Sequence, residues 1–131
     1  MLSLQLTVKI TLRYDKDVKN TFRNEGITYM SNPTQIDTDE LRERLAAGEK
    51  LQLIDVREDE EVNQGMIDGA KHIPLGQIPD RLNEIDKTIP TVLICRSGYR
   101  SERAREYLQQ LGYDHCLNMS GGMIDWVENQ S

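Results

Sequence analysis

Residues 91–101 have the sequence Thr91-Val92-Leu93-Ile94-Cys95-Arg96-Ser97-Gly98-Tyr99-Arg100-Ser101, and this stretch decides the fold. Its first part, 91–95, is almost entirely apolar and rich in β-forming residues, which predicts a central strand covered on both faces. Residues 101–111 place apolar side chains at helical spacing, and Gly112 directly after them is a helix stop signal. The stretch therefore predicts a strand, a loop and a helix, with Cys95 at the carboxyl end of the strand.

The flanking sequence alternates short apolar runs with amphipathic stretches, which is typical of an α/β domain with a parallel sheet. We expect further strands at 51–56, 71–73 and 113–119, and helices at 38–47, 58–63, 78–85 and from about 122 onward. Thr38 is expected to cap the first of these helices. The pattern predicts a mostly parallel five-stranded sheet with helices on both faces over residues 34–129.

The first part of the chain has a different pattern. From Leu2 to Leu12 every even position is apolar, which is the period-two alternation of a half-buried strand. Residues 14–29 are polar and lose the alternation. We therefore expect 1–29 to be an N-terminal extension, either an added strand or a flexible segment, and 30–131 to form the main domain.

Composition excludes several functional classes. A chain of 131 residues with 37% hydrophobic and 29% charged residues fits one globular domain. The net charge of -6 argues against a general nucleic-acid binder, which needs clustered Lys and Arg. No apolar run is long enough for a membrane span or a signal peptide, so we expect a cytoplasmic protein. Cys95 and Cys116 form no Cys-x-x-Cys motif and are expected to be free thiols.

The loop after Cys95 has the composition of an anion cradle. In open α/β sheets ligands bind at the carboxyl ends of strands, and a helix beginning there adds backbone amides and partial positive charge. Gly98 permits the backbone angles that such a loop needs, while Arg96 and Arg100 add cationic side chains. These features favour a thiolate of lowered pKa, which makes Cys95 a nucleophile. A structural cysteine beside two solvated arginines is the alternative, and the combined pattern argues against it.

Four segments together resemble one known family. Residues 95–101 resemble the active-site loop of rhodanese-type sulfurtransferases, in which Cys begins a six-residue cradle that ends near a basic residue. Three further segments are similar to the same family and occur in its order: Ile54-Asp55-Val56-Arg57 with Glu61 following, Asp68-Gly69-Ala70-Lys71-His72-Ile73-Pro74, and Met119-Ser120-Gly121-Gly122-Met123-Ile124-Asp125-Trp126. The resemblance extends over about residues 34–129 and implies a single-domain rhodanese-type sulfurtransferase. Met66 is a departure, because the family often has His there.

The resemblance also implies a reaction. The Cys95 thiolate would take the outer sulfur of thiosulfate or a related small anionic donor, and the persulfide would pass it to a thiol, cyanide or a thioredoxin-like acceptor. The residues implied in substrate binding are Arg96, Ser97, Gly98, Tyr99, Arg100 and Ser101. Arg96 and Arg100 are expected to attract the donor. No metal or organic cofactor is implied.

Asp55 and Arg57 are implied as supporting residues at the base of the site. A turn-capping Asp55 and a surface ion pair between Arg57 and Glu61 would explain them as well. Cys116 and His72 are expected to be packing residues, although Cys116 could resolve an oxidised Cys95. A further expectation places Arg103 and Arg105 on the solvated helix surface and Trp126 over the core.

Two other functions compete with sulfur transfer. Cysteine phosphatases and arsenate reductases also use a Cys-to-Arg cradle, but their loops place five residues between the two, whereas only residues 96–99 separate Cys95 from Arg100. A tighter ring suits a sulfur atom better than a tetrahedral phosphate. A non-catalytic binding module is the third possibility, and the complete loop with its cysteine argues against it.

Overall fold

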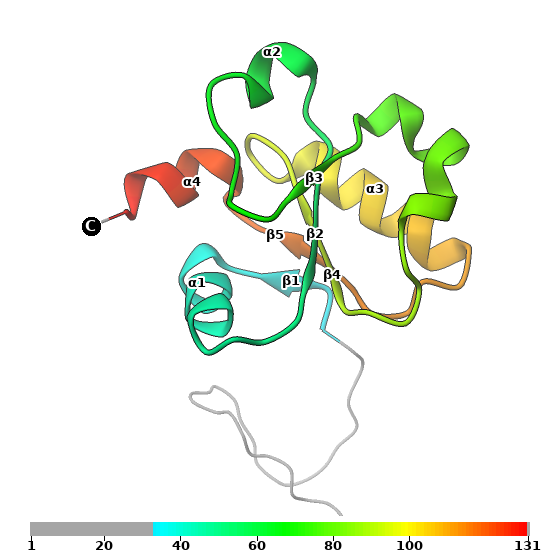
Figure 1. The fold of residues 1–131 in the computed structure, drawn as a ribbon, viewed down its shortest axis with the longest axis horizontal. Helices are drawn as coiled ribbons and strands as arrows, with labels where there is room; N and C mark the ends of the chain where they lie inside the picture. Colours follow the sequence, from blue (N-terminus) through cyan, green and yellow to red (C-terminus); the bar gives the residue numbers. More distant parts are fainter. Residues whose placement is uncertain (1–32, 131) are drawn as a thin grey trace, which may run out of the picture. The chain divides into compact units, whose positions relative to one another are not determined.

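A computed structural model describes residues 33–130 of the chain (Figure 1). In chain order the elements are β1 (Gln35–Ile36), α1 (Thr38–Ala46), β2 (Gln52–Asp55), α2 (Asp59–Val62), β3 (Lys71–His72), η2 (Leu75–Glu84), β4 (Thr91–Ile94), α3 (Tyr99–Gln110), β5 (Cys116–Met119) and α4 (Gly122–Glu128). The expected N-terminal extension at 1–29, with its strand from Leu2 to Leu12, lies outside the described residues.

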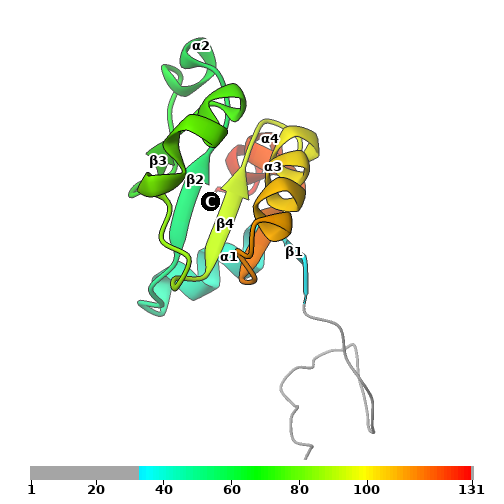
Figure 2. The ribbon, with the colours of Figure 1, turned by 90° about the vertical axis from the view of Figure 1, so that its right-hand side faces the viewer.

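The strands form one five-stranded sheet in the order β1-β5-β4-β2-β3. Every neighbouring pair is parallel, which confirms the predicted sheet. β4 lies in the middle, and all its residues are buried, as its apolar sequence predicts. The carboxyl ends of the strands therefore share one edge of the sheet, and Figures 1 and 2 show α2 at the end where β4 continues into α3.

Helices cover both faces of the sheet. Successive residues of β4 point to opposite sides, so the strand contributes to a core cluster on each face. Leu93 and Cys95 belong to the core cluster under α3 and η2. Val92 and Ile94 belong to the cluster under α1 and α4. Helices on both faces were predicted, and this arrangement confirms them. Within residues 33–130, no helix is long and apolar enough to cross a membrane.

Several element boundaries differ from those predicted. β1 was not predicted, because a strand of two residues gives no periodic signal; its pairing with β5 identifies it. β5 begins at Cys116 and not at residue 113. The helix α3 begins at Tyr99, two positions before the predicted start, because left-handed Gly98 (φ 102°) turns the chain directly into the helix.

The segment predicted as a helix at 78–85 is a 3-10 helix, η2, over Leu75–Glu84. Pro79 lies inside it and removes a backbone donor, which disfavours a continuous α-helix. Arg81 has non-helical backbone angles, with φ -125° and ψ 24°, where two short turns meet. The apolar residues that gave the segment its helical pattern are nevertheless buried as predicted, since Ile78 and Ile85 lie in the core.

The cap of α1 also differs from the prediction. The N-cap residue is Asp37, whose Oδ1 accepts a hydrogen bond of 2.8 Å from the amide of Glu40. Thr38 is instead the first helical residue, and its hydroxyl donates to Asp125 Oδ2 of α4 at 2.8 Å. The hydroxyl therefore joins two helices on one face of the sheet and caps neither.

Candidate active site

Cys95 directly follows β4 and is 1% exposed. Residues 96–98 then turn back, and the amide of Gly98 donates to Cys95 Sγ at 3.1 Å. This contact depends on the positive φ of Gly98 at the start of α3, which aims the amide back at the strand end. The sulfur therefore lies at the base of a backbone loop, as the sequence predicts.

The first turn of α4 holds the loop from behind. The amide of Met123 donates to the carbonyl of Cys95 at 2.9 Å, and the amide of Ile124 donates to the carbonyl of Arg96 at 3.1 Å. These hydrogen bonds satisfy two otherwise unpaired donors at the start of α4. The segment that begins with Gly121 and Gly122 therefore fixes the backbone of the cradle, a role that the sequence did not reveal.

The environment of the sulfur favours the thiolate. Burial alone would raise the pKa of Cys95, but hydrogen bonds from the Ser101 hydroxyl and from the amides of Ser101, Gly98 and Ser97 outweigh it, so that the pKa lies below its ordinary value. The pKa of Cys95 is thus lowered, as predicted. Its main sources are the hydroxyl and the amides, and neither Arg96 nor Arg100 is among the largest.

Ser101 links the sulfur to a buried polar side chain on β5. Its Oγ lies 3.2 Å from Cys95 Sγ and within hydrogen-bond distance of Asn118 Oδ1, so its single proton is shared between these two acceptors. The Asn118 amide nitrogen donates in turn to the carbonyl of Gly98 at 3.1 Å and to Gln35 Oε1 at 2.8 Å. Asn118 was missed by sequence reasoning. A buried Asn inside an otherwise apolar strand is the signal that could have revealed it.

Arg100 lies one residue after the start of α3 and is held by an acidic side chain from another part of the chain. Its two terminal nitrogens donate to the two carboxylate oxygens of Glu61, both at 2.7 Å. The hydrogen bond from Arg100 is the main reason that the pKa of Glu61 falls to about 2. The expected surface pair between Arg57 and Glu61 is therefore wrong, because the Glu61 carboxylate faces Arg100.

Arg57 pairs with Asp55 inside the protein. Nε and Nη2 of Arg57 donate to the Asp55 carboxylate at 3.0 and 2.8 Å, and the two residues are 6% and 0% exposed. Arg57 also donates to the carbonyls of Gly65 at 2.7 Å and Glu61 at 3.3 Å. The pair therefore fastens the segment around α2 to the end of β2, and it places Glu61 beside the loop.

Of the remaining predicted binding residues, Ser97 acts on the sulfur through its backbone amide. Ser97 and Arg96 are exposed, and Tyr99 is 67% exposed beside the loop. Among the described residues, the Arg96 side chain has no ion-pair partner. Ser101 is fully buried and contacts the sulfur itself. Its side chain therefore acts on the nucleophile and does not line a solvent-exposed binding surface.

Three side chains outside the loop are structural. Cys116 pairs in register with Thr91 at the opposite end of β4 from Cys95, and burial raises its pKa to about 11. Four strand positions are about 13 Å, so Cys116 cannot resolve an oxidised Cys95 in this fold. His72 contacts the carbonyl of Arg57 at 2.6 Å. Arg105, expected on the solvated surface, is 7% exposed and paired with Glu102.

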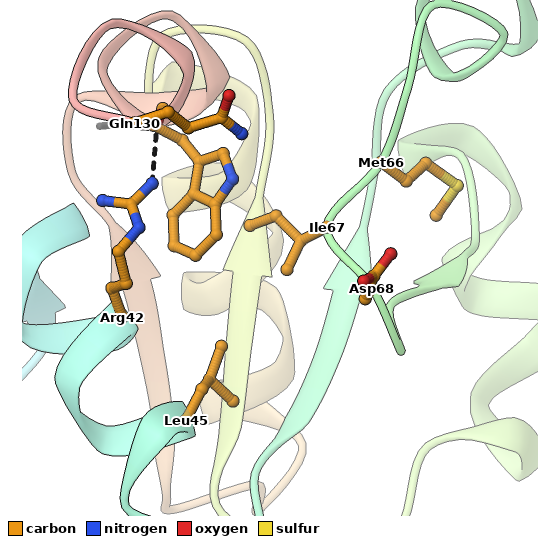
Figure 3. A pocket seen from close by; sticks show the side chains of 7 residues that line it. Arg42, Leu45, Met66, Ile67, Asp68 and Gln130 are labelled. Atoms are coloured by element: carbon orange, nitrogen blue, oxygen red, sulfur yellow. Dashed lines mark hydrogen bonds between the residues drawn. The ribbon is translucent and has the colours of Figure 1, made fainter.

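A separate hollow of about 520 Å³ lies on the face of the sheet covered by α1 and α4 (Figure 3). Its lining residues are Arg42, Leu45, Met66, Ile67, Asp68, Trp126 and Gln130. Arg42 stacks on the Trp126 ring, 3.9 Å from its centre, and donates to the Trp126 carbonyl at 2.9 Å. None of residues 95–101 lines this hollow. The presence of Met66, where the family often has His, therefore affects this surface and leaves the cradle unchanged.

Replacement of Ser101 by Ala should raise the pKa of Cys95, because the hydroxyl provides the strongest of the hydrogen bonds that lower it. The measurement is the pH dependence of Cys95 alkylation by iodoacetamide, whose midpoint reports the thiolate even where access is slow. Wild type should show a midpoint below that of an ordinary thiol, and Ser101→Ala a higher one. Ser97→Ala is the matched control and should leave the midpoint unchanged, since Ser97 acts through its amide.

Comparison with known proteins agrees with this geometry. Residues 37–129 match the family model described as "Rhodanese-like domain". The Bacillus subtilis protein YtwF is 48% identical over 92 residues, which cover 70% of this chain and 88% of that protein. A protein of Allochromatium vinosum named "Sulfurtransferase" is 44% identical over 95 residues, covering 72% and 89%.

The fold is likewise that of a solved relative. The human single-domain sulfurtransferase TSTD1 is similar in structure, with a TM-score of 0.65 and 30% identity, covering 77% of this chain and all of that one. The matched residues 37–129 include Cys95, its loop and the supporting pair of Asp55 and Arg57. The chain therefore belongs to the rhodanese-like domain family and is a sulfurtransferase of that family.

Proposed function

We propose that Cys95 carries sulfane sulfur as a persulfide, which it takes from thiosulfate or a related small donor and passes to a thiophilic acceptor. The observation that carries this proposal is the buried Cys95 sulfur with Gly98 N at 3.1 Å and Ser101 Oγ at 3.2 Å, at the carboxyl end of β4. These donors stabilise a negative sulfur without a metal. The proposal assigns the reaction to the cytoplasm, where two free thiols stay reduced.

The first half-reaction loads the cysteine. The Cys95 thiolate attacks the outer sulfur of thiosulfate, the bond between the two sulfur atoms breaks, and sulfite leaves with the electron pair of that bond. The outer sulfur remains on Cys95 as a persulfide. The amides of residues 96–100 are expected to hold this second sulfur, and the Gly98 and Ser97 amides already donate to the sulfur of Cys95.

The second half-reaction unloads it. A thiolate acceptor, cyanide or a thiol of a thioredoxin-like protein attacks the outer sulfur, and the Cys95 thiolate is the leaving group. A thiol of low pKa leaves faster, so the hydrogen bonds that lower the pKa of Cys95 also assist this step. The hydrogen bonds to Cys95 thus assist both the loading and the unloading half-reaction.

Phosphate chemistry is the rival function, and two observations disfavour it. Only residues 96–99 separate Cys95 from Arg100, and the Arg100 guanidinium is bound at both ends by Glu61. A phosphatase needs that guanidinium for the oxygens of the phosphoryl group. Aryl phosphates are therefore expected to be poor substrates.

The proposal is tested by intact mass spectrometry after incubation with excess thiosulfate. The protein should gain the mass of one sulfur atom, and cyanide or a dithiol should remove it, because only a sulfane sulfur is transferable in this way. Peptide mapping should place the added sulfur on Cys95 and leave Cys116 unmodified. Robust hydrolysis of aryl phosphates, without sulfur gain from any sulfane donor, would contradict the proposal.

A further inference from the structure

The charge of Arg100 is already neutralised in the free protein. Both terminal nitrogens of its guanidinium donate to Glu61, in the two-point geometry that makes arginine–carboxylate pairs strong and specific. The two side chains are only 31% and 26% exposed, so water screens the pair incompletely. With the pKa of Glu61 at about 2, this pair is intact throughout the neutral range.

Arg100 nevertheless lies within electrostatic reach of the reacting sulfur. Glu61 is the main cause that raises the pKa of Arg100, but the negative charges of Cys95 and Glu58 raise it as well. A released Arg100 would therefore attract a negative donor at the cradle. In the structure Glu61 prevents this.

The surroundings of the pair are acidic. Glu58, the N-cap residue of α2, and Asp59 and Glu60 of its first turn are exposed immediately before Glu61. Within the loop, Arg96 is the cation that has no ion-pair partner among the described residues. Its single positive charge compares with the three negative charges of Glu58, Asp59 and Glu60. A dianion that approaches Cys95 past α2 therefore meets these three carboxylates, and the electrostatic penalty grows with the charge of the donor.

We propose that Glu61 is a specificity-determining residue, which neutralises Arg100 and thereby selects sulfane donors whose reacting group carries at most one negative charge, the class that includes thiol persulfides, over dianionic thiosulfate. The inference rests on the proposed sulfur transfer through Cys95 and names the class of donor. It also revises the expectation that Arg100 attracts the dianion, because the guanidinium is engaged by Glu61.

The chemistry of the two donor classes differs in the charge that must enter and leave. With a thiol persulfide, the Cys95 thiolate attacks the terminal sulfur of R–S–SH, the bond between the two sulfur atoms breaks, and the thiolate R–S⁻ departs while the transferred sulfur keeps its proton. With thiosulfate, a dianion enters and a sulfite dianion departs. Only the second reaction needs an uncompensated cation at the rim of the cradle.

The test compares two donors that differ by one charge and share the same kind of scissile bond, thiosulfate and the methanethiosulfonate anion. Each reacts with the thiolate by losing a sulfur(IV) leaving group, sulfite or methanesulfinate. Loading of Cys95 is followed by quenched intact mass spectrometry in wild type and Glu61→Gln. Gln can still accept the hydrogen bond from the Glu58 amide, which Glu61 Oε1 accepts at 2.9 Å, so the start of α2 is preserved.

Glu61→Gln should raise the loading rate with thiosulfate about tenfold and the rate with methanethiosulfonate about threefold, because the gain scales with donor charge. The ratio of the two rates is the decisive number, since any change in the Cys95 thiolate affects both donors equally. An unchanged ratio would overturn the inference.

Two further variants identify the cause. Glu60→Gln removes the same charge from an exposed neighbour that does not contact Arg100, and it should change the ratio by less than about twofold. In Glu61→Gln/Arg100→Gln both partners are neutral, so the ratio should return to the wild-type value. A ratio that Glu60→Gln changes as much as Glu61→Gln would contradict the specific role of Glu61.

The outcomes separate this inference from the function on which it rests. If neither donor leaves a sulfur atom on Cys95 in any variant, the proposed transfer itself is wrong. If both donors load Cys95 but the ratio does not respond to Glu61→Gln, transfer stands and the selection by Glu61 is wrong.

Discussion

Gly122→Ala is expected to lower the free energy of unfolding by about 2 to 4 kcal/mol and to slow sulfur loading about a hundredfold. Gly122 has a φ of +63°, and a Cβ there would overlap the backbone of Arg96 and Ser97. Neither group can shift without losing a contact, because the carbonyl of Arg96 accepts a hydrogen bond from the Ile124 amide and the Ser97 amide donates to the sulfur. The loop must move, and the cradle loses its geometry.

Chemical denaturation and loading by thiosulfate measure the two effects of Gly122→Ala. The matched control is Gly76→Ala, since Gly76 has no left-handed backbone and no atom within 4 Å of the added Cβ. That control should change stability by less than about 0.5 kcal/mol and leave loading unaffected. Wild-type behaviour of Gly122→Ala would show that α4 does not hold the loop in the way described.

Arg57→Leu is expected to lower the free energy of unfolding by about 3 to 5 kcal/mol, because it leaves the fully buried Asp55 carboxylate without its partner. The variant also loses the hydrogen bonds to the carbonyls of Glu61 and Gly65, which position the segment around α2. Thermal and urea unfolding provide the measurement. Full stability of Arg57→Leu would contradict the role of this pair.

Two controls separate the buried charge from other effects of Arg57→Leu. Adding Asp55→Asn to that variant should restore part of the lost stability, since it removes the orphaned charge. Arg81→Leu breaks the surface pair of Arg81 and Glu84 and should leave the unfolding midpoint close to that of wild type. Equal losses in Arg57→Leu and Arg81→Leu would show that burial is not the cause.

The centre of the site could be predicted because its parts are neighbours in the chain. The strand at 91–95, the turn at Gly98 and the helix that follows occupy one continuous stretch, and local propensity with apolar periodicity determines each of them. The cysteine at the end of a buried strand follows from the same stretch. The direction of the Cys95 pKa shift was predictable for this reason.

The weaker predictions failed where a long-range contact competes with a local signal. Thr38 has the sequence position of a helix cap, yet its hydroxyl bonds to Asp125 and Asp37 supplies the cap. β1 exists only through its pairing with β5, which no local pattern of two residues can reveal. In both cases tertiary hydrogen bonds decide between local alternatives of similar energy.

The sequence by itself therefore determined the parallel sheet, the position of Cys95 and the backbone cradle, because strand and helix signals are local. Only the tertiary structure decided what surrounds that cradle. Glu61 and Arg100 are 39 positions apart, and Ser101 and Asn118 are 17 apart. They meet because parallel strands bring their carboxyl ends, and the segments that follow them, to one edge of the sheet. Which charges are paired there depends on three-dimensional distance, which residue spacing along the chain does not specify.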